Sequence, residues 1–442
     1  MKFRTFNQNT IHKLPQVASL PKDQLLAMRA VASVFPFRVN FYVVEKLIDW
    51  SRVPNDPIYQ LVFPQPGMLY PSDLAKMREL IVRGCSSEQL ECAAREIQRE
   101  LNPHPSDQLA LNLPSWGGEP FQGIQHKYRQ TVLFFPTQGQ TCHSYCSYCF
   151  RWAQFIGDPD LRMANHEVER LSQYILAHQD VQSLLFTGGD PMIMSAKVLE
   201  RYIEPLLKIN HLKSIRFGTK SVAYWPYRFV TDSDSDDLLR LFERIQAAGK
   251  TVALMAHYTH SRELSTDIAQ QAVRRIRNTG AVVRAQCPLI QHVNDDEDAL
   301  ADLWNTEVRL GIVPYYLFNH RDTGAMHYFG VPLARSLELF EAARENVSGL
   351  AHTVRGPVMS TSPGKILING VAHIQNQHVF VLKFLQARDP SWTRQVFFAE
   401  YDRQARWMNE LKPALGISFP FTGKHSSRPT EQRLSALVGG PL

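Results

Sequence analysis

The sequence predicts an α/β fold built on a parallel sheet, either an incomplete β/α barrel or an open doubly wound sheet. Three observations support this prediction: short apolar, β-rich runs recur between residues 131 and 318, helical patterns separate them, and neither flank alternates in this way. Alternating strands and helices imply parallel strands joined by right-handed crossovers. In both architectures, ligands bind at the carboxyl ends of the strands.

Six runs are the candidate strands: 131–137, 183–189, 214–218, 251–257, 281–287 and 314–318. The third run, SIRFG, is short enough to be a loop. A helix is expected after the acidic segment TDSDSDD, where Leu238, Phe242 and Ile245 follow helical spacing. Another is expected to begin at Ser265, which is a suitable N-cap residue.

The flanks predict regions of different character. Residues 1–125 are mostly helical in pattern, residues 126–348 hold the alternating segments, and residues 349–442 change to short β-like runs. With 442 residues and 44% hydrophobic content, the chain can bury a large core. We therefore expect a helical N-terminal region, an α/β middle region and a small α+β C-terminal extension.

Composition argues against several classes of function. The net charge of +6 is spread along the chain, which is poor evidence for a nucleic-acid partner. No signal-peptide pattern and no run of about 18 apolar residues is visible, so we expect neither secretion nor a membrane partner. Six cysteines in a chain of this length do not form a disulfide framework. We expect a cytoplasmic protein with a small-molecule substrate.

Half of the cysteines lie in the segment TCHSYCSYCF, as Cys142, Cys146 and Cys149. Structural zinc sites usually use two close pairs of ligands, and the other three cysteines form no second pair. Three thiolates on one loop suit a 4Fe–4S cluster with one open iron, which can hold S-adenosylmethionine for radical chemistry. A zinc site and a chance grouping of small buried residues are the alternatives.

A second motif, FTGGDPM, follows the next predicted strand. Gly188 and Gly189 allow main-chain groups to approach a ligand closely, and Asp190 adds a carboxylate acceptor. Following a strand and a three-cysteine loop, this turn is predicted to bind the methionyl end of S-adenosylmethionine. The alternative is an ordinary turn.

Together with further stretches, these motifs make the chain resemble the lysine 2,3-aminomutase family of radical S-adenosylmethionine enzymes. The matching stretches are HKY (126–128), CHSYCSYCFR (142–151), LFTGGDPM (185–192), FGTK (217–220), AHYTH (256–260), AQCPLIQHVND (285–295) and VPYYLF (313–318). The resemblance implies a partial (β/α)6 radical-SAM barrel and an isomerase that moves an amino group from C2 to C3 of an amino acid. It also implies an electron donor such as flavodoxin or ferredoxin.

The resemblance implies pyridoxal 5′-phosphate as a second cofactor, held by Lys365 in TSPGK. A lysine forms a Schiff base only when deprotonated, so we expect a desolvated pocket that lowers its pKa. Lys127 and Tyr128, with His126, match a segment that binds the coenzyme phosphate, although Thr131 replaces the family's arginine. The alternative for Lys365 is an exposed hairpin lysine.

By the same resemblance, Arg151 binds the substrate carboxylate, since a guanidinium matches a carboxylate bidentately. His257 and Gln286 are candidates for contacts with the adenosyl group. The alternatives are an arginine paired with a structural acid, and two polar residues satisfied within the core.

Departures from the family pattern concern the substrate. Arg321, beside Asp322, occupies the place of an acid that binds the distal amino group of lysine, and the second such acid is missing near Thr361. The glycine-rich run before the coenzyme lysine is reduced to Gly364. A basic residue should repel an ε-ammonium group, so free lysine is disfavoured as substrate.

Two other functions stay open at this point. One is a radical S-adenosylmethionine enzyme without pyridoxal phosphate, such as an epimerase or a dehydrogenase. The other is a non-catalytic iron–sulfur or zinc sensor. The sequence leaves the oligomeric state undetermined, and a homo-oligomer is compatible with it.

Overall fold

A computed structural model describes residues 2–102, 111–157, 161 and 163–422, so the end of the predicted C-terminal region lies outside the described residues. Its centre is a sheet of eleven strands in the order β15-β14-β13-β12-β11-β10-β9-β8-β7-β6-β5. Neighbouring strands from β6 to β12 are parallel, and the remaining pairs at both ends are antiparallel. The sheet is open, with β5 and β15 at its edges.

All six predicted strands are confirmed. They are β6 (Thr131–Phe134), β7 (Ser183–Phe186), β8 (Ser214–Thr219), β9 (Thr251–His257), β10 (Val282–Leu289) and β11 (Val313–Asn319), and β5 (Ile124–Tyr128) precedes them. The short run SIRFG is therefore a strand, β8, and not a loop. A seventh parallel strand, β12 (Arg355–Ser360), was not predicted.

Helices connect the parallel strands, as the alternation indicated. They are α7 (Val168–Ala177), α8 (Ala196–Leu207), α9 (Ser221–Tyr224), α10 (Ser235–Ala247), α11 (Asp267–Asn278), α12 (Glu297–Arg309), α13 (Met326–Phe329) and α14 (Leu333–Glu345). The predicted N-cap of α11 was wrong by one residue. Thr266 accepts the hydrogen bond from the Ala269 amide, while the Ser265 hydroxyl donates to the Arg262 carbonyl.

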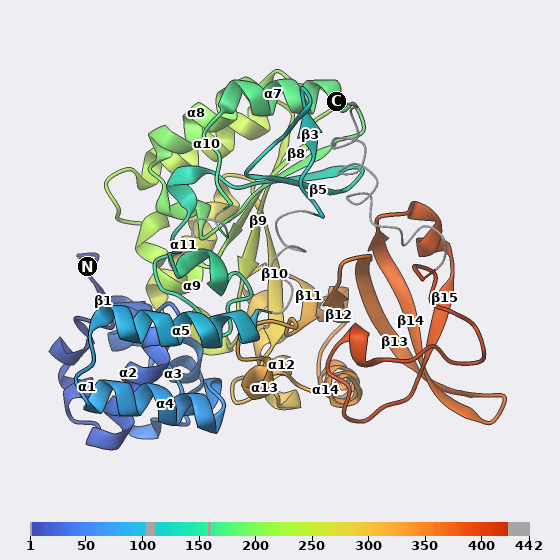
Figure 1. Cartoon of the computed structure of the whole chain (residues 1–442). Helices are drawn as coiled ribbons and strands as arrows, with labels where there is room; N and C mark the ends of the chain where they lie inside the picture. Colours follow the sequence, from blue (N-terminus) through green and yellow to red (C-terminus); the bar gives the residue numbers. More distant parts are fainter. Residues whose placement is uncertain (1, 103–110, 158–160, 162, 423–442) are drawn as a thin grey trace, which may run out of the picture.

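The N-terminal region is mostly helical, as predicted (Figure 1). Backbone hydrogen bonds join it to the cysteine loop. Its helices are α1 (Pro15–Ala18), α2 (Lys22–Val34), α3 (Pro57–Val62), α4 (Pro71–Val82) and α5 (Ser87–Leu101), and a short strand pair joins β1 (Thr5–Asn7) to β2 (Arg38–Asn40). The Arg38 carbonyl accepts from the Tyr145 amide at 2.8 Å, and the Leu61 carbonyl accepts from the Ser147 amide at 2.8 Å. One hydrophobic core spans this region and the parallel strands.

The C-terminal strands form a lobe to one side of the parallel sheet (Figure 1). They are β13 (Gly364–Ile374), β14 (Gln377–Ala387) and β15 (Val396–Glu400), and their own hydrophobic core packs against α14. Among the described residues, no helix is both long and apolar enough to cross a membrane.

Candidate active site

A cavity of about 800 Å³ opens at the carboxyl ends of the parallel strands, where the sequence placed the ligand site. The structure brings together around it every predicted site residue: Lys127, Tyr128, Cys142, Cys146, Cys149, Arg151, Gly188, Gly189, Asp190, His257, Gln286 and Lys365. The neighbouring His126 instead hydrogen-bonds the Tyr174 hydroxyl at 2.6 Å, on the side of α7. Of the HKY segment, Lys127 and Tyr128 line the cavity.

The three loop cysteines are free thiols that are half-buried against this cavity. Burial raises the pKa of Cys142 and of Cys146, and raises the pKa of Cys149 to about 12. Iron would convert them to thiolates, because a bound cation outweighs this cost of desolvation. Within the described part of the chain, no three His, Cys, Asp or Glu side chains converge as ligands of a single ion.

The two glycines of the GGD turn face the cysteine loop. Gly188 has a φ of +136°, and a Cβ built on it would collide with the Gln140 side chain. A Cβ on Gly189 would collide with the Thr141 backbone, and the Gly189 amide donates to the Gly139 carbonyl at 3.1 Å. The space expected for a ligand beside these two Cα atoms is therefore filled by the chain just before Cys142. Binding of S-adenosylmethionine by this turn stays a prediction.

Asp190 is buried, and its carboxylate is surrounded by donors. It accepts hydrogen bonds from the Met192 amide at 2.9 Å, the Thr219 hydroxyl at 2.7 Å and the Lys220 amide at 2.9 Å. The Ser221 hydroxyl donates a further bond at 2.9 Å. Burial raises the pKa of Asp190, and these hydrogen bonds oppose that shift. The carboxylate thus ties the end of β7 to the end of β8, and a direct contact with S-adenosylmethionine stays a prediction.

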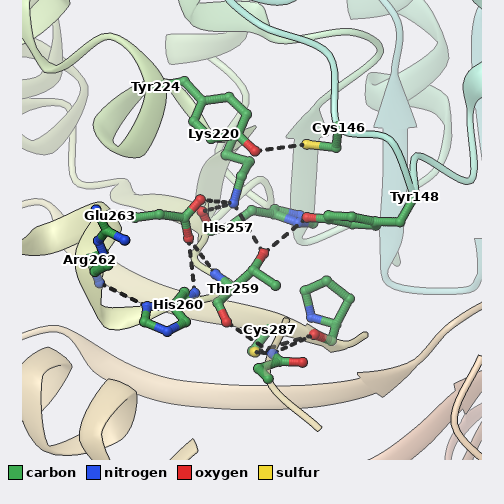
Figure 2. A network of polar contacts seen from close by, with 12 residues as sticks. Cys146, Tyr148, Lys220, Tyr224, His257, Thr259, His260, Arg262, Glu263 and Cys287 are labelled. Carbon is green, nitrogen blue, oxygen red and sulfur yellow. Dashed lines mark hydrogen bonds and ion pairs between the residues drawn. The ribbon is translucent and has the colours of Figure 1, made fainter. Parts of the chain in front are cut away.

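A polar network beside the cysteine loop was not predicted (Figure 2). Lys220, at the end of β8, forms a buried ion pair with Glu263 at 2.6 Å. Its ammonium also donates to the Thr259 hydroxyl at 3.2 Å and the His257 carbonyl at 3.3 Å. The Thr259 hydroxyl lies 3.1 Å from the Tyr148 hydroxyl in the cysteine loop. Lys220 therefore links the ends of β8 and β9 to that loop.

His257 and Gln286 are paired across β9 and β10 at the cavity wall. Burial, together with the positive charges of Lys220 and Arg151, lowers the pKa of His257 to about 4. The imidazole is therefore neutral at physiological pH and can accept as well as donate a hydrogen bond. Both side chains line the cavity, and their contact with the adenosyl group stays a prediction.

Lys365, at the start of β13, is enclosed by aromatic and cationic neighbours. Its amine donates to the Gln386 amide oxygen at 2.9 Å and lies 4.8 Å from the centre of the Tyr316 ring. Burial, followed by the charges of Arg216 and Arg355, lowers the pKa of Lys365 to about 7. Lys365 therefore lies in the desolvated pocket that was expected for it. The alternative interpretation, an exposed lysine in a hairpin, is wrong.

Two guanidinium groups meet at one aromatic ring of the cysteine loop. The Cζ atom of Arg151 lies 5.0 Å, and that of Arg321 5.4 Å, from the centre of the Phe150 ring. Arg151 also lies 4.5 Å over Phe135. Arg321 and Asp322 both line the cavity, so the arginine contributes to its wall. Arg151 and Arg321 thus give this side of the cavity positive charge.

Arg216 and Gln386 are two cavity residues that sequence reasoning missed. Arg216 interrupts the apolar strand SIRFG, and a polar residue within a buried strand was a usable signal. Gln386 reaches Lys365 through the antiparallel pairing of β13 with β14, which the sequence does not specify. The C-terminal lobe therefore contributes residues to the wall of this cavity.

Comparisons with known proteins agree with the motifs. The chain is 31% identical over 395 residues to the "Putative L-lysine 2,3-aminomutase" of Aquifex aeolicus, covering 89% of this chain and 92% of that one. It is 24% identical over 342 residues to the "L-lysine 2,3-aminomutase" of Bacillus subtilis, covering 73% and 68%. Streptococcus suis SuiB bound to S-adenosylmethionine aligns with 10% identity and a TM-score of 0.36, covering 62% and 57%. That TM-score is too low to support a conclusion, and no family model matches the chain.

The chain carries a three-cysteine loop at the carboxyl ends of a parallel α/β sheet, and its sequence is related to that of the Aquifex protein. Together these features define the class of protein as a radical S-adenosylmethionine enzyme. The similarity to the Aquifex protein extends over most of both chains, and this chain belongs to the lysine 2,3-aminomutase family of isomerases. The resemblance seen in the motifs is thereby confirmed.

Proposed function

We propose that the chain catalyses migration of an amino group from C2 to C3 of an amino acid that lacks a distal ammonium group. The observation that carries this proposal is that the Lys365 amine and the three loop thiols line one cavity. When bound, a 4Fe–4S cluster with S-adenosylmethionine supplies an adenosyl radical, and pyridoxal phosphate supplies a conjugated system that spreads the unpaired electron.

The residues present fit both cofactors. Cys142, Cys146 and Cys149 offer soft thiolate ligands of the kind that iron–sulfur clusters use. Lys365 would hold the coenzyme aldehyde, because its lowered pKa supplies a neutral amine. Arg216 would hold the phosphate, because it lines the same cavity and its charge acts on Lys365. Its buried Nε atom has no hydrogen-bond partner among the described residues.

The substrate class follows from the two guanidinium groups at Phe150. Arg151 would bind the α-carboxylate, and Arg321 would face the side chain. A cation at that position repels an ε-ammonium group and favours a neutral or acidic side chain.

A competition assay with lysine, glutamate and a neutral amino acid tests this proposal, following 5′-deoxyadenosine and the position of the amino group. We expect a preference of about 10²–10³-fold against lysine. Arg321→Asp should reduce that preference, whereas Arg335→Asp, on the exposed face of α14, should leave it unchanged. Efficient turnover of free lysine by the unaltered enzyme would overturn the assignment of Arg321.

A radical S-adenosylmethionine enzyme without pyridoxal phosphate is the second candidate. The observation in its favour is that the Lys127 amine, from the segment expected at the phosphate, donates to the Thr361 carbonyl. An absorption band that depends on Lys365 distinguishes the two candidates.

A further inference from the structure

Tyr224 presents its hydroxyl to one cysteine of the loop. It ends α9, is 1% exposed, and its oxygen lies 3.6 Å from the Cys146 sulfur (Figure 2). Tyr224 and Cys146 are 78 residues apart in the chain, so this contact is made by the fold. The aminomutase-like activity proposed above assigns no role to Tyr224.

The ring of Tyr224 is held in this position from two sides. The Lys220 ammonium lies 4.8 Å from the ring centre, and Lys220 is itself fixed by its ion pair with Glu263. On the main chain, the Asn40 side-chain amide donates to the Tyr224 carbonyl at 2.7 Å and to the His143 carbonyl at 3.3 Å. Asn40 thus ties α9 to the cysteine loop, and the hydroxyl is kept pointing at the sulfur.

The direction of the hydrogen bond follows from the chemistry of the sulfur. A free thiol can donate to the tyrosine oxygen, but a cysteine bound to iron has lost its proton and can only accept. The hydroxyl is then the only donor in this contact. Hydrogen bonds to cluster sulfurs are one of the features that set reduction potentials, because they stabilise the more negatively charged reduced state.

We propose that Tyr224 donates a hydrogen bond to the Cys146 sulfur of the bound cluster and thereby raises the reduction potential of the cluster. This inference rests on the proposed cluster. Lys220 acts here as a positioning residue, since its ammonium packs on the Tyr224 ring. Its charge also acts on the Cys146 sulfur, but it is present equally in the unaltered protein and in the Tyr224 variants.

The test is a redox titration of the reconstituted full-length protein, without S-adenosylmethionine, in which the reduced cluster is followed by electron paramagnetic resonance. Tyr224→Phe should give a more negative midpoint potential than the unaltered protein at equal iron content. Tyr42→Phe is the matched control, because it also removes a buried hydroxyl, one that contacts Thr266 rather than a cysteine. Its midpoint potential should equal that of the unaltered protein.

An unchanged midpoint in Tyr224→Phe, with a full cluster, would overturn the inference and leave the proposed function standing. Failure of the unaltered protein to bind iron would instead overturn the proposed function. If Tyr224→Phe does not fold, 3-fluorotyrosine at position 224 gives a second test. Its more acidic hydroxyl is a stronger donor and should shift the midpoint to a more positive potential, and an unchanged or more negative value would contradict the inference.

Discussion

Lys365 is expected to be a nucleophile at neutral pH. Burial and the charges of Arg216 and Arg355 lower its pKa from 10.5 to about 7. This lowering of the pKa corresponds to a free-energy cost of about 5 kcal/mol for the ammonium form of Lys365 in the folded protein. At pH 7 about half of Lys365 is the neutral amine, compared with roughly one molecule in 3,000 for an ordinary lysine.

The same shift has a consequence for stability. Between pH 7 and 10.5 the unfolded chain holds a proton on this lysine and the folded chain does not. The contribution of Lys365 to the free energy of unfolding therefore rises with pH across that window. Below pH 7 the folded protein holds Lys365 as a buried ammonium group, and this lowers the free energy of unfolding by the largest amount.

Competitive labelling with acetic anhydride, analysed by mass spectrometry, measures the pKa directly. The reactivity of Lys365 should titrate with a midpoint near 7, with the exposed Lys383 of β14 as an internal comparison. Arg216→Met should raise the midpoint only in part, because burial is the larger cause of the shift. A midpoint above about 9 in the unaltered protein, close to that of an ordinary lysine, would refute the reasoning.

Two further predictions concern the GGD turn. Gly189→Val should lower the iron content of the reconstituted protein, because a side chain there collides with the Thr141 backbone beside Cys142. Gly349→Val, where a Cβ meets nothing within 4 Å, is the control, and equal iron in both variants would contradict the prediction. Asp190→Ala should lower the free energy of unfolding in urea by about 2–4 kcal/mol, since it leaves donors at the end of β8 and the start of α9 without their acceptor. Asp237→Ala, at an exposed carboxylate, should change little, and a similar loss in both variants would argue against the role of Asp190.

The strands were predictable where their residues carried a periodic signal. β6 to β11 are apolar runs separated by helical patterns, and even the short β8 followed from that alternation. β12 was missed because it contains Gly356 and Pro357, residues that normally mark turns or sheet edges. The structure accommodates both residues between β11 and β13.

The candidate site was predictable where a motif was compact in the sequence. The loop of Cys142, Cys146 and Cys149 fits within ten residues, and the cavity contains all three. Contacts between distant segments carried no such signal. Gly189 packs against Thr141, and Lys220 pairs with Glu263, through folding alone. The nearest neighbours of the two glycines are Gln140 and Thr141, a contact that the sequence did not indicate.

The central claim is that a cluster and a lysine-bound coenzyme share one cavity. The most direct measurement is the visible spectrum of the anaerobically purified protein, with iron and sulfide analysis, compared with that of Lys365→Ala. We expect about four irons and four sulfides per chain in both proteins. An additional imine band should be present in the unaltered protein and absent from the variant, because Lys365 supplies the only amine assigned to the coenzyme. Stoichiometric zinc in place of iron, or an imine band that survives Lys365→Ala, would contradict the account.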